Sequence, residues 1–178
     1  MNLKQQYEQE VKEKLKTELK IKNSMAVPTI KKITINIGLG EAISNPKIID
    51  KVREDLSHIT GQMPVATKSK KDISNFKVRK GMTIGMMVTL RGDKMWDFAQ
   101  KLISVTLPRI RDFRGLEPKS FDGKGNFSVG IKEYNTFAEI DPNTIDRVRG
   151  LQVTIQTNAI DNKSGKLLLE TLGFPFKK

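Results

Sequence analysis

The sequence predicts an α+β fold: a two-layer domain with a mostly antiparallel sheet, helices on one face and a long basic hairpin loop. Several segments alternate apolar and polar residues, as strands with one buried face do. Other segments repeat apolar residues every three or four positions, as amphipathic helices do. A lysine-rich run separates two of the predicted strands. The 178 residues, 37% of them hydrophobic, suffice for one core, so we expect residues 1–178 to form a single domain.

The first third of the chain predicts a helix, a strand and a second helix. Apolar residues at every fourth position predict a helix over residues 3–21 packed on the domain, although such a stripe can also recruit a partner. Isoleucines alternate with polar residues over residues 33–37, which predicts a half-buried strand. The Ser-Asn-Pro stretch at 44–46 suits the start of a helix that ends at Gly61.

The remaining elements follow from the same patterns. Asp93 is expected to cap a helix that closes before Pro108, and Gly173 is expected to end a final short helix. In chain order, the predicted elements are a strand at 63–67, a strand at 83–90, a helix at 93–107, strands at 127–131 and 151–155, and a helix at 167–172.

The composition favours a nucleic-acid-binding protein over an enzyme. A formal charge of +12 and a pI near 9.9 indicate affinity for polyanions. The chain has no Cys and one His, which excludes thiolate zinc sites and most nucleophilic dyads, so we expect no catalytic residue, metal or cofactor. The mixed-charge N-terminus lacks a signal-peptide pattern, and no apolar run approaches the roughly 20 residues of a membrane span. We therefore expect a soluble, cytoplasmic protein without membrane contact.

One motif resembles part of an enzyme site. Gly38-Leu39-Gly40 lies between a predicted strand and helix, where a dinucleotide-binding site has its glycine turn, but the third glycine of that fingerprint is replaced by Ile43. Two glycines before a helix also let a sugar-phosphate backbone approach closely, and they equally suit a tight turn. A small nucleotide-dependent enzyme is therefore the alternative from another class.

Residues 68–81 form a protruding basic loop between two predicted strands. The loop concentrates positive charge around Phe76 and contains one acid, Asp72, a composition that suits phosphates and offers a ring to a base or ribose. A solvated hairpin tip is the alternative. A second basic cluster lies between Pro108 and Gly115, where three arginines suit phosphate or carboxylate recognition, or a solvated loop.

The polar positions of the predicted strands are rich in hydroxyl and amide side chains. Such side chains suit hydrogen bonds to ribose, phosphate and base edges, and they equally suit a sheet face that meets only water. The positions are Thr34, Asn36, Thr83, Thr89, Arg91, Gln152, Thr154 and Gln156.

Strings along the whole chain match the pattern of one family. They are TGQMPV at 60–65, KK at 70–71, NFKVRKG at 75–81, VTLRG at 88–92, LPRIRDFRG at 107–115, GKGNFSVGIKE at 123–133 and LGFPF at 172–176. Together they resemble bacterial ribosomal protein five of the large subunit, the 5S-rRNA-binding protein of the central protuberance. The resemblance implies a structural ribosomal protein with a sheet whose concave face binds 5S rRNA. It also implies 23S rRNA and other central-protuberance proteins as partners.

The family's RNA contacts come from the first strand, the turn after it and nearby sheet residues. By matching positions, the implied 5S rRNA contacts are Lys31, Lys32, Asn36, Gly38, Gly40, Gln62, Pro64, Thr67, Lys68, Thr89 and Arg91.

The resemblance implies two further contacts. The basic loop reaches the elbow of the tRNA in the P site through Lys70, Lys71, Ser74, Asn75, Phe76, Lys77, Arg79 and Lys80. The opposite region forms an intersubunit bridge to ribosomal protein thirteen of the small-subunit head, with Arg109, Arg111, Asp112 and Arg114 as candidates.

The chain departs from the family's pattern at two positions. Asp72 stands where a small neutral residue is usual, so it adds a negative charge that is expected to weaken or redirect the tRNA contact. Ala138 stands where a proline is common, which loosens a turn near the expected bridge. A free RNA-binding regulatory protein that uses the same sheet is the alternative function.

Overall fold

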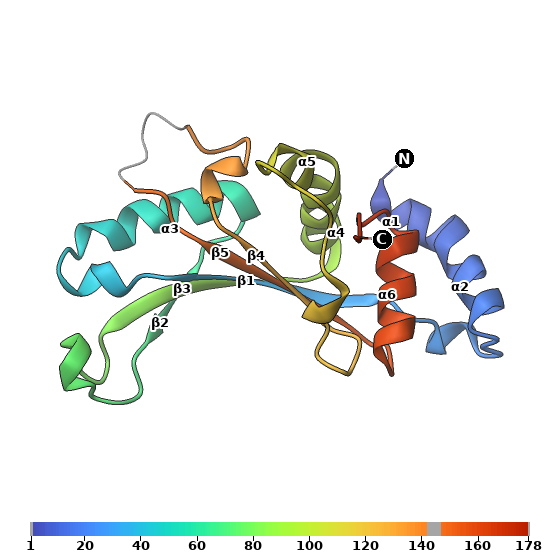
Figure 1. Ribbon diagram of the computed structural model, residues 1–178, viewed down its shortest axis with the longest axis horizontal. Coiled ribbons are helices and arrows are strands. Elements are labelled where there is room, and N and C mark those ends of the chain that lie inside the picture. Colours follow the sequence, from blue (N-terminus) through green and yellow to red (C-terminus); the bar gives the residue numbers. More distant parts are fainter. Residues whose placement is uncertain (1, 142–146, 178) are drawn as a thin grey trace. The chain divides into compact units, whose positions relative to one another are not determined.

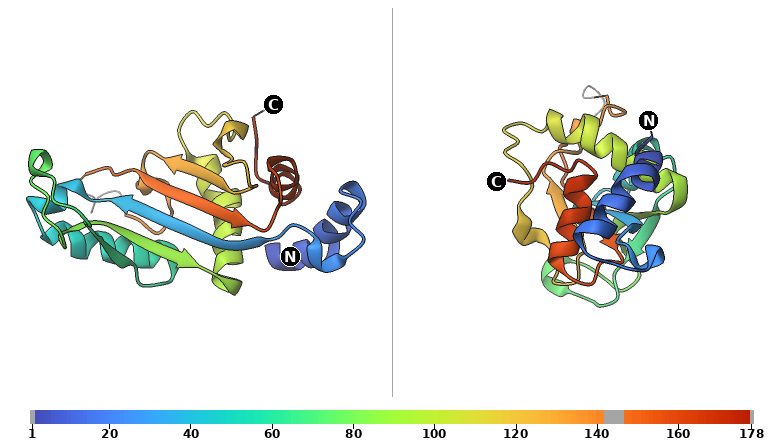
Figure 2. Two further views of the ribbon diagram at one scale, coloured as in Figure 1. Left: turned by 90° about the horizontal axis from the view of Figure 1, so that it is seen from below. Right: turned by 90° about the vertical axis from the view of Figure 1, so that its right-hand side faces the viewer.

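The protein is described by a computed structural model over residues 2–141 and 147–177, and it divides into two compact units. Unit 1 comprises Met1–Ile33, Arg91–Val129 and Thr154–Lys178, and unit 2 comprises Thr34–Leu90 and Gly130–Val153. Five strands form an antiparallel sheet in the order β2-β3-β1-β5-β4 (Figure 1; Figure 2, left). The α+β fold is therefore confirmed, and the single domain stays a prediction.

The strands show the predicted alternation of buried and open positions. On β1, Ile33, Ile35 and Ile37 are buried, whereas Thr34 and Asn36 are half-buried. The strands are β1 (Ile30–Gly38), β2 (Val65–Lys68), β3 (Thr83–Leu90), β4 (Phe127–Ile131) and β5 (Leu151–Thr157). One side of the sheet therefore contributes to the core, and the polar side stays open.

In unit 2, one helix covers the buried side of the sheet. Helix α3 (Lys47–Thr60) packs against β3 with Val52, Leu56 and Ile59 buried in the core. It ends as predicted at Gly61, whose φ of +64° is the left-handed conformation that glycine adopts readily.

In unit 1, the N-terminal helix lies against α4 (Gly92–Lys101). It consists of α1 (Leu3–Gln6), a π-helical turn (Tyr7–Val11) and α2 (Lys12–Glu18). The rings of Tyr7 and Trp96 lie 5.3 Å apart, and Lys4 Nζ lies 2.8 Å from Asp93 Oδ1. Asp93 is thus an ion-pair partner in the first turn rather than the predicted cap, since the cap position is Arg91.

Helix ends depart most from the sequence prediction. The first helix ends at Glu18 instead of residue 21, because Lys20 has a left-handed φ of +52° and the Ile21 N–H donates back to the Lys16 carbonyl. The helix that begins with α4 continues through a π-helical turn (Leu102–Thr106) into α5 (Leu107–Arg109), so it passes Pro108. The π-helical turn lies just before Pro108. A turn of this wider kind fits a proline, which has no backbone N–H to donate.

The last helix also starts earlier than predicted. Helix α6 (Asn162–Thr171) begins after Asp161, whose carboxylate accepts the Ser164 N–H at 3.0 Å. This cap lies before Gly165, whose Cα approaches the Gly125 backbone closely: an added Cβ would lie 2.6 Å from the Gly125 carbonyl oxygen. The glycine is needed for packing although it weakens the helical pattern.

Candidate nucleic-acid interface

The basic loop of unit 2 has a hydrogen-bonded base between β2 and β3. The Ser69 N–H donates to the Met82 carbonyl at 2.8 Å, and the Gly81 N–H donates to the Ser69 carbonyl at 2.9 Å. Further out, Ile73 and Val78 exchange two backbone hydrogen bonds of 2.8 and 3.1 Å. The loop is therefore a closed hairpin rather than an open coil.

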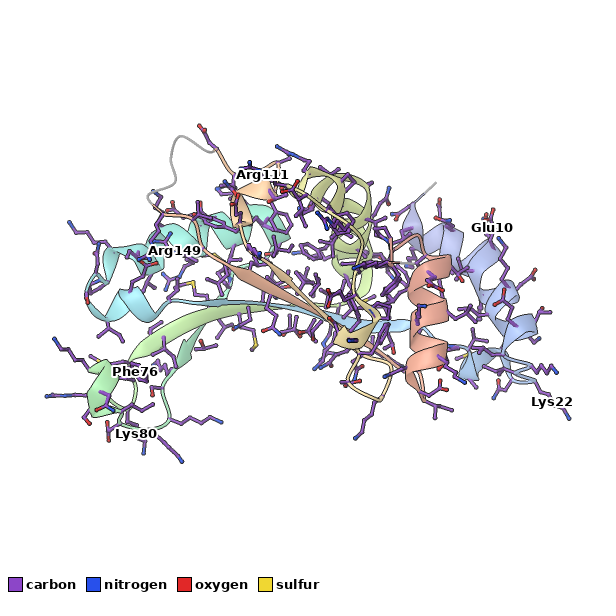
Figure 3. The ribbon with its side chains drawn as sticks, viewed as in Figure 1. Glu10, Lys22, Phe76, Lys80, Arg111 and Arg149 are labelled. Atoms are coloured by element: carbon purple, nitrogen blue, oxygen red, sulfur yellow. The ribbon has the colours of Figure 1, made fainter. Side chains whose placement is uncertain are left out.

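The tip of this hairpin presents its charged and aromatic side chains to solvent. A short 3₁₀ turn, Ser74–Phe76, precedes Lys77, which has a left-handed φ of +54°. Phe76 is 71% exposed, and Figure 3 shows it on the loop with Lys80. Exposed positions include all the predicted tRNA-contacting residues: Lys70, Lys71, Ser74, Asn75, Phe76, Lys77, Arg79 and Lys80.

The cations of the loop form no ion pair with any acidic residue that the structure describes across residues 2–141 and 147–177. A cation without an internal counter-charge attracts an external anion more strongly, so these side chains are available to phosphates.

Two of the predicted 5S rRNA contacts are brought together on unit 2. The Gln62 amide Nε2 donates to the Thr89 carbonyl at 3.2 Å, which holds the end of α3 beside β3. Thr67 lies directly opposite Gly85 on β2 and β3. Pro64 is buried, so it offers little surface and instead fixes the chain between Gln62 and β2.

The glycines at 38 and 40 are exposed and have no internal reason to be glycine. A Cβ built on either would have no atom within 4 Å, and neither has a left-handed φ. Gly85 contrasts with them, because its added Cβ would lie 2.7 Å from the Ile37 carbonyl oxygen and 2.8 Å from Thr67 Oγ1. Packing requires the glycine at 85, whereas Gly38 and Gly40 leave space for a molecule outside the chain.

Arg149, a buried arginine, holds Glu41 in place directly after the glycine turn at residues 38–40. Arg149, 6% exposed, donates from Nε to Glu41 Oε1 at 2.9 Å, and Arg147 donates from Nη1 to Glu41 Oε2 at 3.2 Å. Glu41 directly follows Gly40, so the ion pairs hold the turn in place.

A second polar contact in unit 2 joins α3 to the segment after β4. The Tyr134 hydroxyl donates to Asp55 Oδ2 at 3.2 Å. Burial raises the pKa of Asp55 above its ordinary value, although the Tyr134 hydrogen bond opposes the shift. Burial also raises the pKa of Tyr134, which keeps its hydroxyl protonated as the donor.

Three apolar side chains on the open side of unit 2 were not predicted as contacts. Met63 and Val65 are each 66% exposed and Met87 is 36% exposed, and Val65 pairs directly with Met87. The signal was present in the sequence, because Val65 alternates with Thr67 on one strand and Met87 lies between the outward positions Thr83 and Thr89 of the next. Exposed apolar groups can contact ribose and base faces.

Two more predicted contacts lie in unit 2, the half-buried Asn36 and the exposed Lys68, and the others lie in unit 1. Lys31 and Arg91 are exposed and Lys32 is half-buried. The bridge candidates follow the end of α5, and Arg109, Arg111, Asp112 and Arg114 are all exposed.

Family models cover nearly the whole chain. The model described as ribosomal protein L5 matches residues 23–79, and the model that describes the C-terminus of the same ribosomal family matches residues 83–176. The chain belongs to the ribosomal protein L5 family.

Curated relatives agree with this membership. The large ribosomal subunit protein uL5 of Symbiobacterium thermophilum is 53% identical over 175 residues, which is 98% of this chain and 97% of the relative. The uL5 proteins of Dichelobacter nodosus and Francisella tularensis are 54% and 53% identical, and the matches span 96% and 98% of both chains, respectively.

Membership in the L5 family has direct consequences. The protein is a large-subunit ribosomal protein that acts with ribosomal RNA and ribosomal proteins, and it is not an enzyme. The alternative of a small nucleotide-dependent enzyme is therefore wrong. Among the described helices, none has the length and apolar character needed to cross a membrane.

Proposed function

We propose that this protein binds 5S rRNA and helps to attach it in the central protuberance of the large subunit. The observation that supports this most is the pair of exposed glycines, Gly38 and Gly40, which neither packing nor backbone conformation requires. A position without a side chain lets a sugar-phosphate backbone approach the protein backbone closely.

The surface around this turn suits folded RNA. The open face of unit 2 supplies amide and hydroxyl groups from Asn36, Gln62, Thr67 and Thr89, and it ends at the exposed cation Lys68. On the same proposal, Lys31, Lys32 and Arg91 of unit 1 neutralise further phosphates. 23S rRNA and the other central-protuberance proteins complete the partners.

The basic loop serves a separate contact with the P-site tRNA. Its tip presents Phe76 for stacking and unpaired cations for phosphates, and stacking on an aromatic side chain contributes about 1–3 kcal/mol per base. A hairpin closed by its own backbone bonds can present these groups to a tRNA that binds and leaves.

The arginine cluster after α5 supplies the bridge to ribosomal protein thirteen of the small-subunit head. Arg109, Arg111 and Arg114 are exposed and suited to bidentate carboxylate contacts. Asp112 offers the opposite charge to a basic partner.

Filter binding tests the 5S rRNA proposal. We expect the protein to bind 5S rRNA much more tightly than an unrelated RNA of equal length at physiological salt. At low salt the difference shrinks, because phosphate contacts without sequence information then dominate. Equal affinity for both RNAs at physiological salt would contradict the proposal.

A further inference from the structure

Asp72 is the one acidic residue of the basic loop, and its carboxylate is used within the loop. Asp72 Oδ1 accepts a hydrogen bond from the backbone N–H of Lys80 at 2.7 Å. The bond crosses the hairpin between its two strands. On the Asp72 side, Ser69 Oγ donates to the Lys71 carbonyl at 2.7 Å, which holds the adjoining backbone.

This bond closes the part of the hairpin where backbone pairing is interrupted. The base is paired through Ser69, and the outer part is paired through Ile73 and Val78. Between them, the Lys80 N–H has the Asp72 carboxylate as its acceptor. Hydrogen bonds to a charged acceptor are stronger than neutral ones, so this single contact can fix the middle of the loop.

The arrangement also limits the electrostatic effect of Asp72. Asp72 lines a hollow of about 540 Å³ together with Ser74, Lys77, Val78 and Arg79. The lining thus carries two cations and one anion, and the Lys80 N–H donates to one oxygen of that anion. The hollow keeps a net positive lining that suits a phosphate.

We infer that Asp72 is a positioning residue of the tRNA-contacting loop: its bond to the Lys80 N–H holds the loop's cations in place for a phosphate. The inference rests on the proposed tRNA contact. The charge of Asp72 alone leads to the opposite expectation, that Asp72 weakens tRNA binding.

Two substitutions separate the effect of the Asp72 charge from the effect of its hydrogen bond to the Lys80 N–H. Asp72→Asn removes the charge and keeps an oxygen acceptor, whereas Asp72→Ala removes both. We expect exchange of the Lys80 amide to accelerate on the order of tenfold in Asp72→Ala, and much less in Asp72→Asn. We also expect Asp72→Ala to weaken binding of deacylated tRNA on the order of fivefold, because the cations lose their fixed arrangement. Asp72→Asn should retain most of the affinity.

The two readouts distinguish failure of this inference from failure of the proposed function. The inference is overturned if Asp72→Ala binds tRNA as tightly as the unmodified protein or more tightly, or if its Lys80 amide stays equally protected. A loop that does not contact tRNA gives a different result: the variant with both Lys77→Ala and Lys80→Ala then binds tRNA normally, whatever the amide exchange shows.

Discussion

Replacing Gly38 and Gly40 by alanine, singly, separates the needs of the fold from the needs of RNA binding. Neither glycine has a left-handed φ, and the added Cβ meets no atom within 4 Å. Alanine restricts the unfolded chain more than glycine does, so each substitution should leave the free energy of unfolding unchanged or raise it by about 0.4–1 kcal/mol.

The same methyl group lies where we propose that the RNA backbone makes its close approach. A methyl forced into a packed contact costs about 1–3 kcal/mol, which corresponds to an affinity loss of roughly 5- to 150-fold. Urea unfolding measures the free energy of unfolding, and filter binding of 5S rRNA at physiological salt measures the loss of affinity.

Two other glycines of unit 2 serve as controls. Gly85→Ala should destabilise the fold by about 1–3 kcal/mol, because its Cβ would lie 2.7 Å from the Ile37 carbonyl oxygen. Gly150→Ala should leave 5S rRNA affinity unchanged and should affect stability as Gly38→Ala does, since its Cβ would make only an ordinary contact of 3.7 Å. Unchanged 5S rRNA affinity in both Gly38→Ala and Gly40→Ala would refute the close approach of the RNA backbone at this turn. Strong destabilisation by either substitution would refute the argument that the fold does not require these glycines.

Three further predictions concern the loop and the two polar networks of unit 2. Combining Phe76→Ala with Lys77→Ala should weaken tRNA binding by about 1–3 kcal/mol through lost stacking, with 5S rRNA affinity nearly unchanged; lost 5S rRNA binding would show that the two surfaces are wrongly assigned. Arg149→Ala should lower the free energy of unfolding by at most about 3 kcal/mol, because Glu41 loses a buried partner but is itself 30% exposed and keeps Arg147. Arg147 pairs with the same Glu41 carboxylate, but its side chain is 72% exposed. Arg147→Ala should therefore lower the free energy of unfolding by less than about 1 kcal/mol in the same urea experiment. The pKa of Asp55 is raised, so the folded state keeps the Asp55 proton to higher pH than the unfolded chain does. The contribution of Asp55 to stability therefore falls as the pH rises from its ordinary pKa of 3.8 through the raised pKa. Asp55→Asn should remove that fall, so its stability relative to the unmodified protein should rise over this range; a constant difference would contradict the assignment.

The strands and the end of α3 were predictable because their signals are local, whereas α3 starts after Pro46, which takes the cap position expected for Ser44 or Asn45. Alternating isoleucines define β1, and Gly61 ends α3 where a left-handed residue is needed. Helix ends without a glycine signal were not predictable. Lys20 adopts a left-handed φ although it is not glycine, and the π-helical turn before Pro108 has no signature in composition.

The candidate site was predictable in outline and not in its internal contacts. The charge of the loop is visible in the sequence, but the bond from the Lys80 N–H to Asp72 depends on how the hairpin closes. The difference between Gly38 and Gly85 is invisible in the sequence, because it depends on which atoms lie next to each Cα. The ion pairs of Arg149 and Glu41 join residues far apart in the chain, so no local pattern could reveal them.

Lysine acetylation footprinting of the protein with each RNA tests most directly whether its cations form two separate RNA-binding surfaces. With 5S rRNA bound, Lys31, Lys32 and Lys68 should lose reactivity, while the loop lysines at 70, 71, 77 and 80 stay reactive. Adding tRNA should then protect the loop lysines. Uniform protection of both sets by either RNA, or protection of neither set, would contradict the account.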